Sequence, residues 1–106
     1  MASSSDFVAE RRFPGIAFGI QSVDAQVHRN LGLVLDEQGK LSEAAGQFAE
    51  AARLAPYDPQ IRLSLGMALA KQGKREEAIA QYNEALRLKP DFLQAQQELR
   101  NLAAPR

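Results

Sequence analysis

The chain has 106 residues, enough for one small domain, and carries 13 basic and 13 acidic side chains. A formal net charge of zero disfavours partners held by an overall positive field, such as nucleic acid or an anionic membrane surface. The sequence contains no cysteine and a single histidine, His28, which excludes disulfides and thiol nucleophiles and argues against a histidine-based metal or catalytic site. No apolar run reaches the roughly 18 residues that a membrane span requires. We therefore expect a cytoplasmic protein with no cofactor, no metal and no catalytic residues.

Residues 1–21 are expected to form a flexible arm in front of the domain. Within this arm, residues 13–20 are apolar, but they include a Pro-Gly pair and show no helical spacing. We expect a brief helix at most over residues 6–12, and the helices of the domain to begin after residue 21.

Apolar residues at three- and four-residue steps predict a helix over about 23–38 and a second helix that ends near residue 54. Gly39 lies between them, where glycine can adopt the left-handed conformation that ends a helix. Ser42 is the predicted N-cap of the second helix, and Pro56 is expected to stop it.

The next two helices show the same signals. Asp58 and Pro59 form an N-cap and first-turn pair, Gly73 marks the turn, and the partner helix is predicted over about 75–88. Asp91 is then expected to cap a fifth helix with one apolar and one polar side. A polar outer face is what the open end of a helical stack needs for solubility.

A shift of 34 residues places the first helix pair on the second: Leu31-Gly32 falls on Leu65-Gly66, and Pro56 falls on Pro90. A fixed period of this size is typical of stacked repeats, in which each unit buries its apolar face against its neighbour. The sequence therefore predicts an all-α fold, an α-solenoid of antiparallel helix pairs (an α-α superhelix).

The repeated residues resemble the tetratricopeptide repeat (TPR) family. That family has glycine at position eight of each unit, small residues at positions 20 and 27, an aromatic residue at position 24 and proline at position 32. The resemblance implies a TPR domain over 22–106, with repeat 1 at 25–58, repeat 2 at 59–92 and a capping helix at 91–103. The matching residues are Gly32, Ala44, Phe48, Ala51 and Pro56 in repeat 1, and Gly66, Ala78, Tyr82, Ala85 and Pro90 in repeat 2.

Position four departs from the family pattern, because His28 and Arg62 stand where the family usually has a bulky residue. Neither departure threatens the predicted fold. We expect His28 to be a half-buried spacer between helices and not a ligand or a catalytic group.

In TPR proteins the first helices of successive units line a concave groove, and the resemblance assigns residues of this chain to it. Leu33, Leu63 and Met67 would form an apolar floor, and methionine suits an adaptable site. These three side chains could instead complete the packing between helices. The implied partner-binding residues are Gln26, Arg29, Asn30, Leu33, Asp36, Gln60, Leu63, Met67, Lys71, Gln94 and Gln97.

Two known modes of TPR binding fit this chain poorly. Some TPR domains hold the acidic C-terminal tails of heat-shock chaperones through clustered lysines and asparagines, and others hold a peptide backbone on a ladder of asparagines. Arg29 and Asn30 suit the first mode, but Leu63 and Ser64 stand at the matching places in repeat 2. For the ladder only Asn30 matches, because Ser64 and Glu98 follow it in the next two units.

The outer flank of the helix over 23–38 has no preceding unit to cover it. Three covers remain open: the apolar residues Phe13, Ile16, Phe18 and Ile20 folding back, a second copy of the chain forming a homodimer, or another part of a larger protein. Fewer than three repeats are marginal for a stable stack, which makes some cover necessary.

We expect the function to be non-catalytic: a protein-protein interaction module that binds a peptide or protein segment in the groove. The alternatives are a self-association module and an accessory domain of a larger enzyme, such as a glycosyltransferase. An enzyme within this chain is disfavoured, because no nucleophile, general base and orienting group fall together at a spacing that a helix pair would gather.

Overall fold

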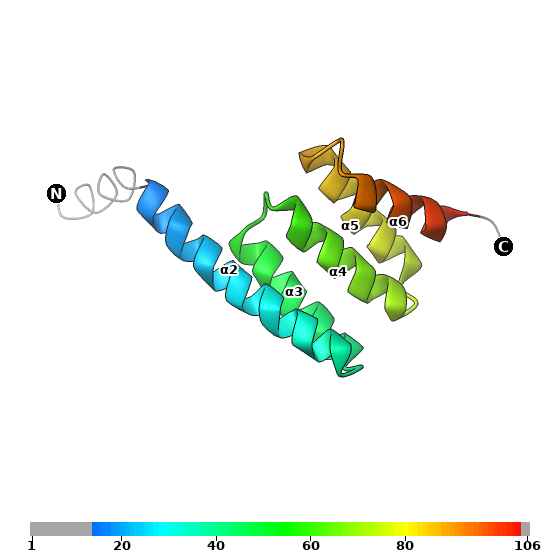
Figure 1. The fold of residues 1–106 in the computed structure, drawn as a ribbon, viewed down its shortest axis with the longest axis horizontal. Helices are drawn as coiled ribbons and strands as arrows, with labels where there is room; N and C mark the ends of the chain where they lie inside the picture. Colours follow the sequence, from blue (N-terminus) through cyan, green and yellow to red (C-terminus); the bar gives the residue numbers. More distant parts are fainter. Residues whose placement is uncertain (1–13, 105–106) are drawn as a thin grey trace.

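The computed structural model describes the backbone of residues 14–104 and the side chains of residues 23–104. This part of the chain contains five helices and no strand, which confirms the predicted all-α fold (Figure 1). None of these helices is long and apolar enough to cross a membrane. Their bounds are Pro14–Glu37 for α2, Leu41–Leu54 for α3, Pro59–Lys71 for α4, Arg75–Leu88 for α5 and Leu93–Ala103 for α6.

The first helix begins earlier than the sequence predicts. α2 starts at Pro14 and runs for 24 residues, so the expectation that residues 14–20 are not helical is wrong. Proline suits the first position of a helix, because its missing N–H would have no partner there. The missed signal is the spacing of Ile16 and Ile20, which continues that of Val23 and Val27 at steps of four, three and four. Phe13 and the rest of 1–13 lie outside the described residues, and the domain boundary at residue 22 stays a prediction.

Both helix pairs turn at a glycine in the left-handed region, as predicted. Gly39 has a φ of 80° and Gly73 a φ of 81°, a conformation that side chains disfavour. In each turn the next residue donates a hydrogen bond across the helix end, Lys40 N to Leu35 O and Lys74 N to Leu69 O, both at 2.9 Å. The two hairpins therefore close in the same way.

One predicted N-cap is confirmed and two are wrong. Asp58 Oδ1 accepts from Gln60 N at 2.9 Å, with Pro59 as the first residue of α4. In contrast, Lys40 is the N-cap residue of α3 and makes no side-chain capping bond; its carbonyl accepts the first hydrogen bond of the helix from Ala44 N, so Ser42 lies within the first turn. Likewise α6 begins after the buried Phe92 and not after Asp91.

Within each unit the two helices pack closely because glycine faces an aromatic ring. A Cβ atom on Gly32 would lie 2.6 Å from Phe48 Cε1, and one on Gly66 would lie 2.6 Å from Tyr82 Cε1. Both rings are almost fully buried, with exposed fractions of 2% for Phe48 and 1% for Tyr82. Small residues beside them are also buried, namely Ala44, Ala51, Ala78 and Ala85.

A polar link joins the two helices of each unit on one side of this contact. His28 Nδ1 lies 2.8 Å from Gln47 Oε1, and Arg62 Nη1 donates to Gln81 Oε1 at 3.1 Å. The two links occupy equivalent positions, and His28 is half-buried. The unusual residues at position four thus serve the packing of the unit.

The five helices form a curved double layer. α2 contacts α3, α4 contacts α5, and the units join through α3 with α4 and α5 with α6. In addition α2 touches α4 and α4 touches α6, whereas α3 and α5 make no such contact in the described chain. The first helices are therefore closer together than the second helices, which places α2, α4 and α6 on the inside of the curve.

The close glycine contact predicts opposite effects for two Gly→Ala changes. Gly66→Ala should destabilise the fold by about 1–3 kcal/mol, because the new methyl group overlaps the buried Tyr82 ring. Gly46→Ala is the matched control: it lies within α3 with nothing within 4 Å of a Cβ, and should stabilise by about 0.5–1 kcal/mol. Urea unfolding followed by circular dichroism measures both, and equal effects would contradict the packing argument.

Burial of Tyr82 predicts a loss of stability at high pH. Desolvation raises the pKa of Tyr82 from 10.0 to about 12, so the folded state keeps the phenol protonated where the unfolded state releases it. Stability should therefore fall as pH rises through this window and be unaffected below it. The equivalent residue in repeat 1 is Phe48, so Tyr82→Phe is a conservative control. The difference between the two proteins' unfolding free energies should appear only above about pH 10.

Candidate functional site

The residues predicted to bind a partner lie on the three helices of the inner layer. We call the accessible side chains of this set, on α2, α4 and α6, the inner surface. Asn30, Leu33, Gln60, Lys71, Gln94 and Gln97 are exposed, whereas Gln26, Arg29, Asp36 and Met67 are half-buried.

Leu63 differs from the rest of this set. Its side chain is 1% exposed and belongs to the core, so a partner has no access to it. Of the three apolar residues predicted for the groove floor, Leu33 and Met67 remain accessible, Leu33 with an exposed fraction of 38%. They stand at the same repeat position in successive units.

An ion pair crosses the inner surface from one unit to the next. Lys71 Nζ donates to both carboxylate oxygens of Asp36, at 2.8 Å and 3.0 Å. The side chains are 48% and 22% exposed, so water screens the pair and its contribution to stability is small. Its larger effect is that the Lys71 charge is already neutralised by the protein itself.

The inner surface consequently offers little unpaired positive charge. Arg29 is the remaining cation among the predicted residues, and it is half-buried. At the matching places in α4, Leu63 and Ser64 are both buried, with exposed fractions of 1% and 7%. The structure therefore brings together no cluster of basic side chains on α2 and α4.

Three glutamines follow the repeat along the inner surface. Gln26, Gln60 and Gln94 occupy the second position of three successive units, one on each inner helix. A side-chain amide both donates and accepts hydrogen bonds, as a peptide backbone does. The row can therefore present the same pairing group to a ligand at each unit.

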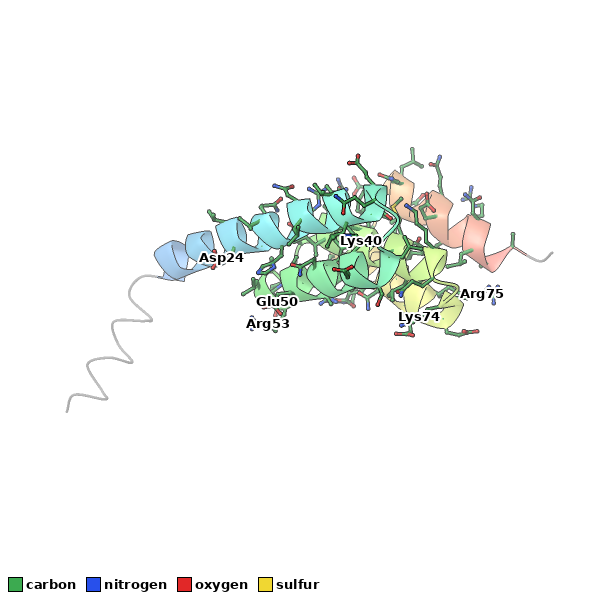
Figure 2. All side chains as sticks on the ribbon, turned by 90° about the horizontal axis from the view of Figure 1, so that it is seen from below. Asp24, Lys40, Glu50, Arg53, Lys74 and Arg75 are labelled. Carbon is green, nitrogen blue, oxygen red and sulfur yellow. The ribbon has the colours of Figure 1, made fainter. Side chains whose placement is uncertain are left out.

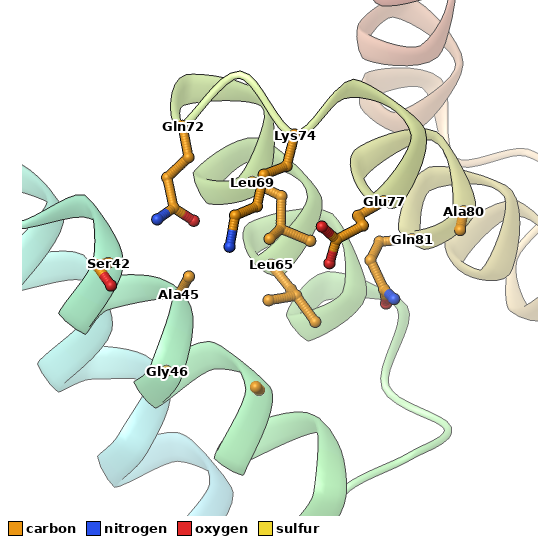
Figure 3. Close-up of a pocket in the computed structure, with 11 residues that line it drawn as sticks. Ser42, Ala45, Gly46, Leu65, Leu69, Gln72, Lys74, Glu77, Ala80 and Gln81 are labelled. Atoms are coloured by element: carbon orange, nitrogen blue, oxygen red, sulfur yellow. The ribbon is translucent and has the colours of Figure 1, made fainter.

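The outer layer has a hollow that the sequence analysis missed. It measures about 410 Å³ and lies between α3 and α5, with Leu65 and Leu69 of α4 at its floor. Figure 3 shows Gln72 and Lys74 reaching over this floor. None of the predicted partner-binding residues lines it.

This hollow exists because α3 offers only small side chains on that face, namely Ala45, Gly46 and Ala49. The equivalent residues in α5 are Ile79, Ala80 and Asn83. This difference between units was visible in the sequence.

Two equivalent ion pairs lie on the outer helices. Arg53 donates to Glu50 on α3, where the two side chains lie together in Figure 2, and Arg87 donates to Glu84 on α5. Hydrogen bonding to the guanidinium lowers the pKa of Glu50 and of Glu84 below the usual value. Both pairs are solvent-exposed. Across the described residues, no three His, Asp or Glu side chains gather as metal ligands would.

Solved structures share this architecture. The first TPR domain of Spaghetti (RPAP3), bound to the HSP90 peptide SRMEEVD, is 23% identical with a TM-score of 0.73. The TPR2B domain of yeast Sti1, in a complex with pHsp70, is 27% identical with a TM-score of 0.74. Each match covers 76% of this chain, which spans 66% and 65% of those two chains, just under two thirds.

A mutant of MamA is also similar, at 23% identity and a TM-score of 0.68, with 92% of this chain and 73% of that chain covered. No curated protein sequence matches the chain. The profile of the family described as "Tetratricopeptide repeat" matches residues 9–59, 30–91 and 63–99. These matches together extend over most of the sequence, and the chain therefore belongs to the tetratricopeptide repeat family.

Proposed function

We propose that this chain is a non-catalytic protein-interaction module that binds an extended peptide or protein segment on its inner surface. The observation that carries the proposal is the position of α2, α4 and α6 on the inside of the curve, because these three helices carry the predicted partner-binding residues. The structural neighbours from RPAP3 and yeast Sti1 support it, because both are TPR domains in complexes with chaperones or chaperone peptides.

The apolar contacts would come from Leu33 and Met67. Because they occupy the same position in successive units, a ligand that lies across α2 and α4 meets both. The row of Gln26, Gln60 and Gln94 would pair with the ligand backbone. Packed helices lie roughly 8–10 Å apart, which equals about three residues of an extended chain. Because Leu33 and Met67 are apolar and the inner surface has little unpaired charge, the site would favour a segment with an apolar residue and few charges.

Peptides can be selected for binding to the immobilised chain, and their affinity should depend on Leu33 and Met67. The double variant Leu33→Glu/Met67→Glu is expected to weaken their binding at least about 10-fold, because each change places a charge against an apolar ligand group. Tyr57→Glu is the control, since Tyr57 is 71% exposed and lies outside the inner surface. Isothermal titration gives the affinities. Selected peptides that bind the double variant as tightly as the wild type would contradict the proposal.

The acidic peptide SRMEEVD should bind weakly, with a dissociation constant above about 1 mM, because Asp36 already neutralises Lys71. Asp36→Asn should release Lys71 and strengthen this binding by roughly 2- to 5-fold. Nuclear magnetic resonance titration of the labelled chain measures both. Tight binding to the wild type that Arg29→Ala abolishes would show instead that this chain is a receptor for acidic tails.

A further inference from the structure

One face of α2 carries an exposed apolar stripe. Val23, Val27, Leu31 and Val34 have exposed fractions of 63%, 58%, 45% and 48%, and steps of four, four and three residues place them on one side of the helix. We call these four residues the outer stripe. Figure 1 shows α2 at one edge of the stack, with its opposite side against α3.

The repeat shows what kind of surface the outer stripe is. Three of its four counterparts in repeat 2 are buried, the exception being Tyr57 at the position of Val23, and the helix that precedes them, α3, packs against α4. The outer stripe is therefore the face that in this fold receives another helix. The three counterparts, with their exposed fractions, are Ile61 (0%) for Val27, Leu65 (8%) for Leu31 and Ala68 (2%) for Val34.

The described chain does not cover the stripe itself. Residues 14–22 continue α2 as one helix, so Ile16, Phe18 and Ile20 do not turn back over it as the first of the three covers would require.

The opposite end of the stack offers no matching surface. Arg100 of α6 stands at repeat position eight, where Gly32 and Gly66 let a partner helix approach. Arg100 is exposed, so a long charged side chain stands on this end of the stack. Stacking the end of one copy on the start of another would bury this charge against apolar residues, which is costly.

A second copy nevertheless has one suitable surface, its own outer stripe. Apart from α2, the large apolar side chains exposed in the described residues are Tyr57 and Leu93, which stand singly. An antiparallel pairing of two α2 helices sets apolar residues against apolar residues along the stripe. The zero net charge of the chain adds no repulsion between copies.

We propose that two copies of this chain form a symmetric dimer through their outer stripes, with α2 antiparallel to α2 of the second copy. Such a contact uses the same patch on both subunits, so it closes at two and does not propagate. The inner surface lies on another side of α2 and stays open in the dimer. The dimer is independent of the peptide binding proposed above.

Sedimentation equilibrium of the full chain tests the dimer. The wild type should associate to a dimer and no further, and Val27→Glu should raise the dissociation constant at least about 100-fold, because each dimer would bury two unpaired carboxylates. Val27 is 58% exposed, so the variant should keep its helical circular dichroism. Leu93→Glu is the matched control, since Leu93 is also apolar and 63% exposed, and it should leave the dimer intact.

Disulfide trapping tests the geometry, because the chain has no cysteine of its own. Val27→Cys and Leu31→Cys lie near the middle of the outer stripe, where two antiparallel helices bring like residues closest. At least one of them should form a covalent dimer on oxidation, which requires Cα atoms within about 7 Å of each other. Leu93→Cys should not.

Three outcomes would overturn the dimer: a monomeric wild type up to about 1 mM, a dimer that Val27→Glu does not weaken, or equal trapping at positions 27, 31 and 93. Peptide binding by Val27→Glu is measured in parallel. If that binding persists while the dimer is lost, the two surfaces are separate. Loss of the selected peptides in Leu33→Glu/Met67→Glu alone bears only on the proposed function.

Discussion

The contact between a glycine and an aromatic ring within each helix pair determines the rest of the structure. Gly32 against Phe48, and Gly66 against Tyr82, set how closely two helices approach. No side chain other than hydrogen fits at these positions while the rings stay in place. The close approach buries the small residues around it and leaves each unit with a flat apolar flank, and the flank is what makes the units stack.

The separation of inner and outer helices follows from this packing and produces two different surfaces. The first helices touch each other across units and gather polar and apolar side chains on a curved face. The second helices stay apart, and small residues on α3 leave a hollow between them. One repeat pattern therefore creates a curved face of polar and apolar side chains and, on the other side, a depression floored by leucine.

Much of the fold could be predicted from the sequence, because its signals are repeated. The 34-residue period, the turn glycines and the Asp58–Pro59 start each have a local physical cause, and the structure confirms them. The start of α2 was not predicted, because Pro14 and two nearby glycines are residues that usually interrupt a helix. The helical spacing of Ile16 and Ile20 in the same segment was overlooked. The burial of Leu63 could not be predicted, since it depends on how α4 is rotated between its neighbours. The ion pair of Asp36 and Lys71 depends on tertiary geometry in the same way.

Arg100 has a consequence for the length of the helical array. A helix that paired with α6 in the manner of α3 with α2 would meet a long charged side chain at the point of closest approach. Packing of a further helix on that side of α6 as closely as α3 packs on α2 would require a small residue at this position. Tandem copying of the 34-residue unit inside the array, in contrast, keeps every glycine in register and preserves both ends.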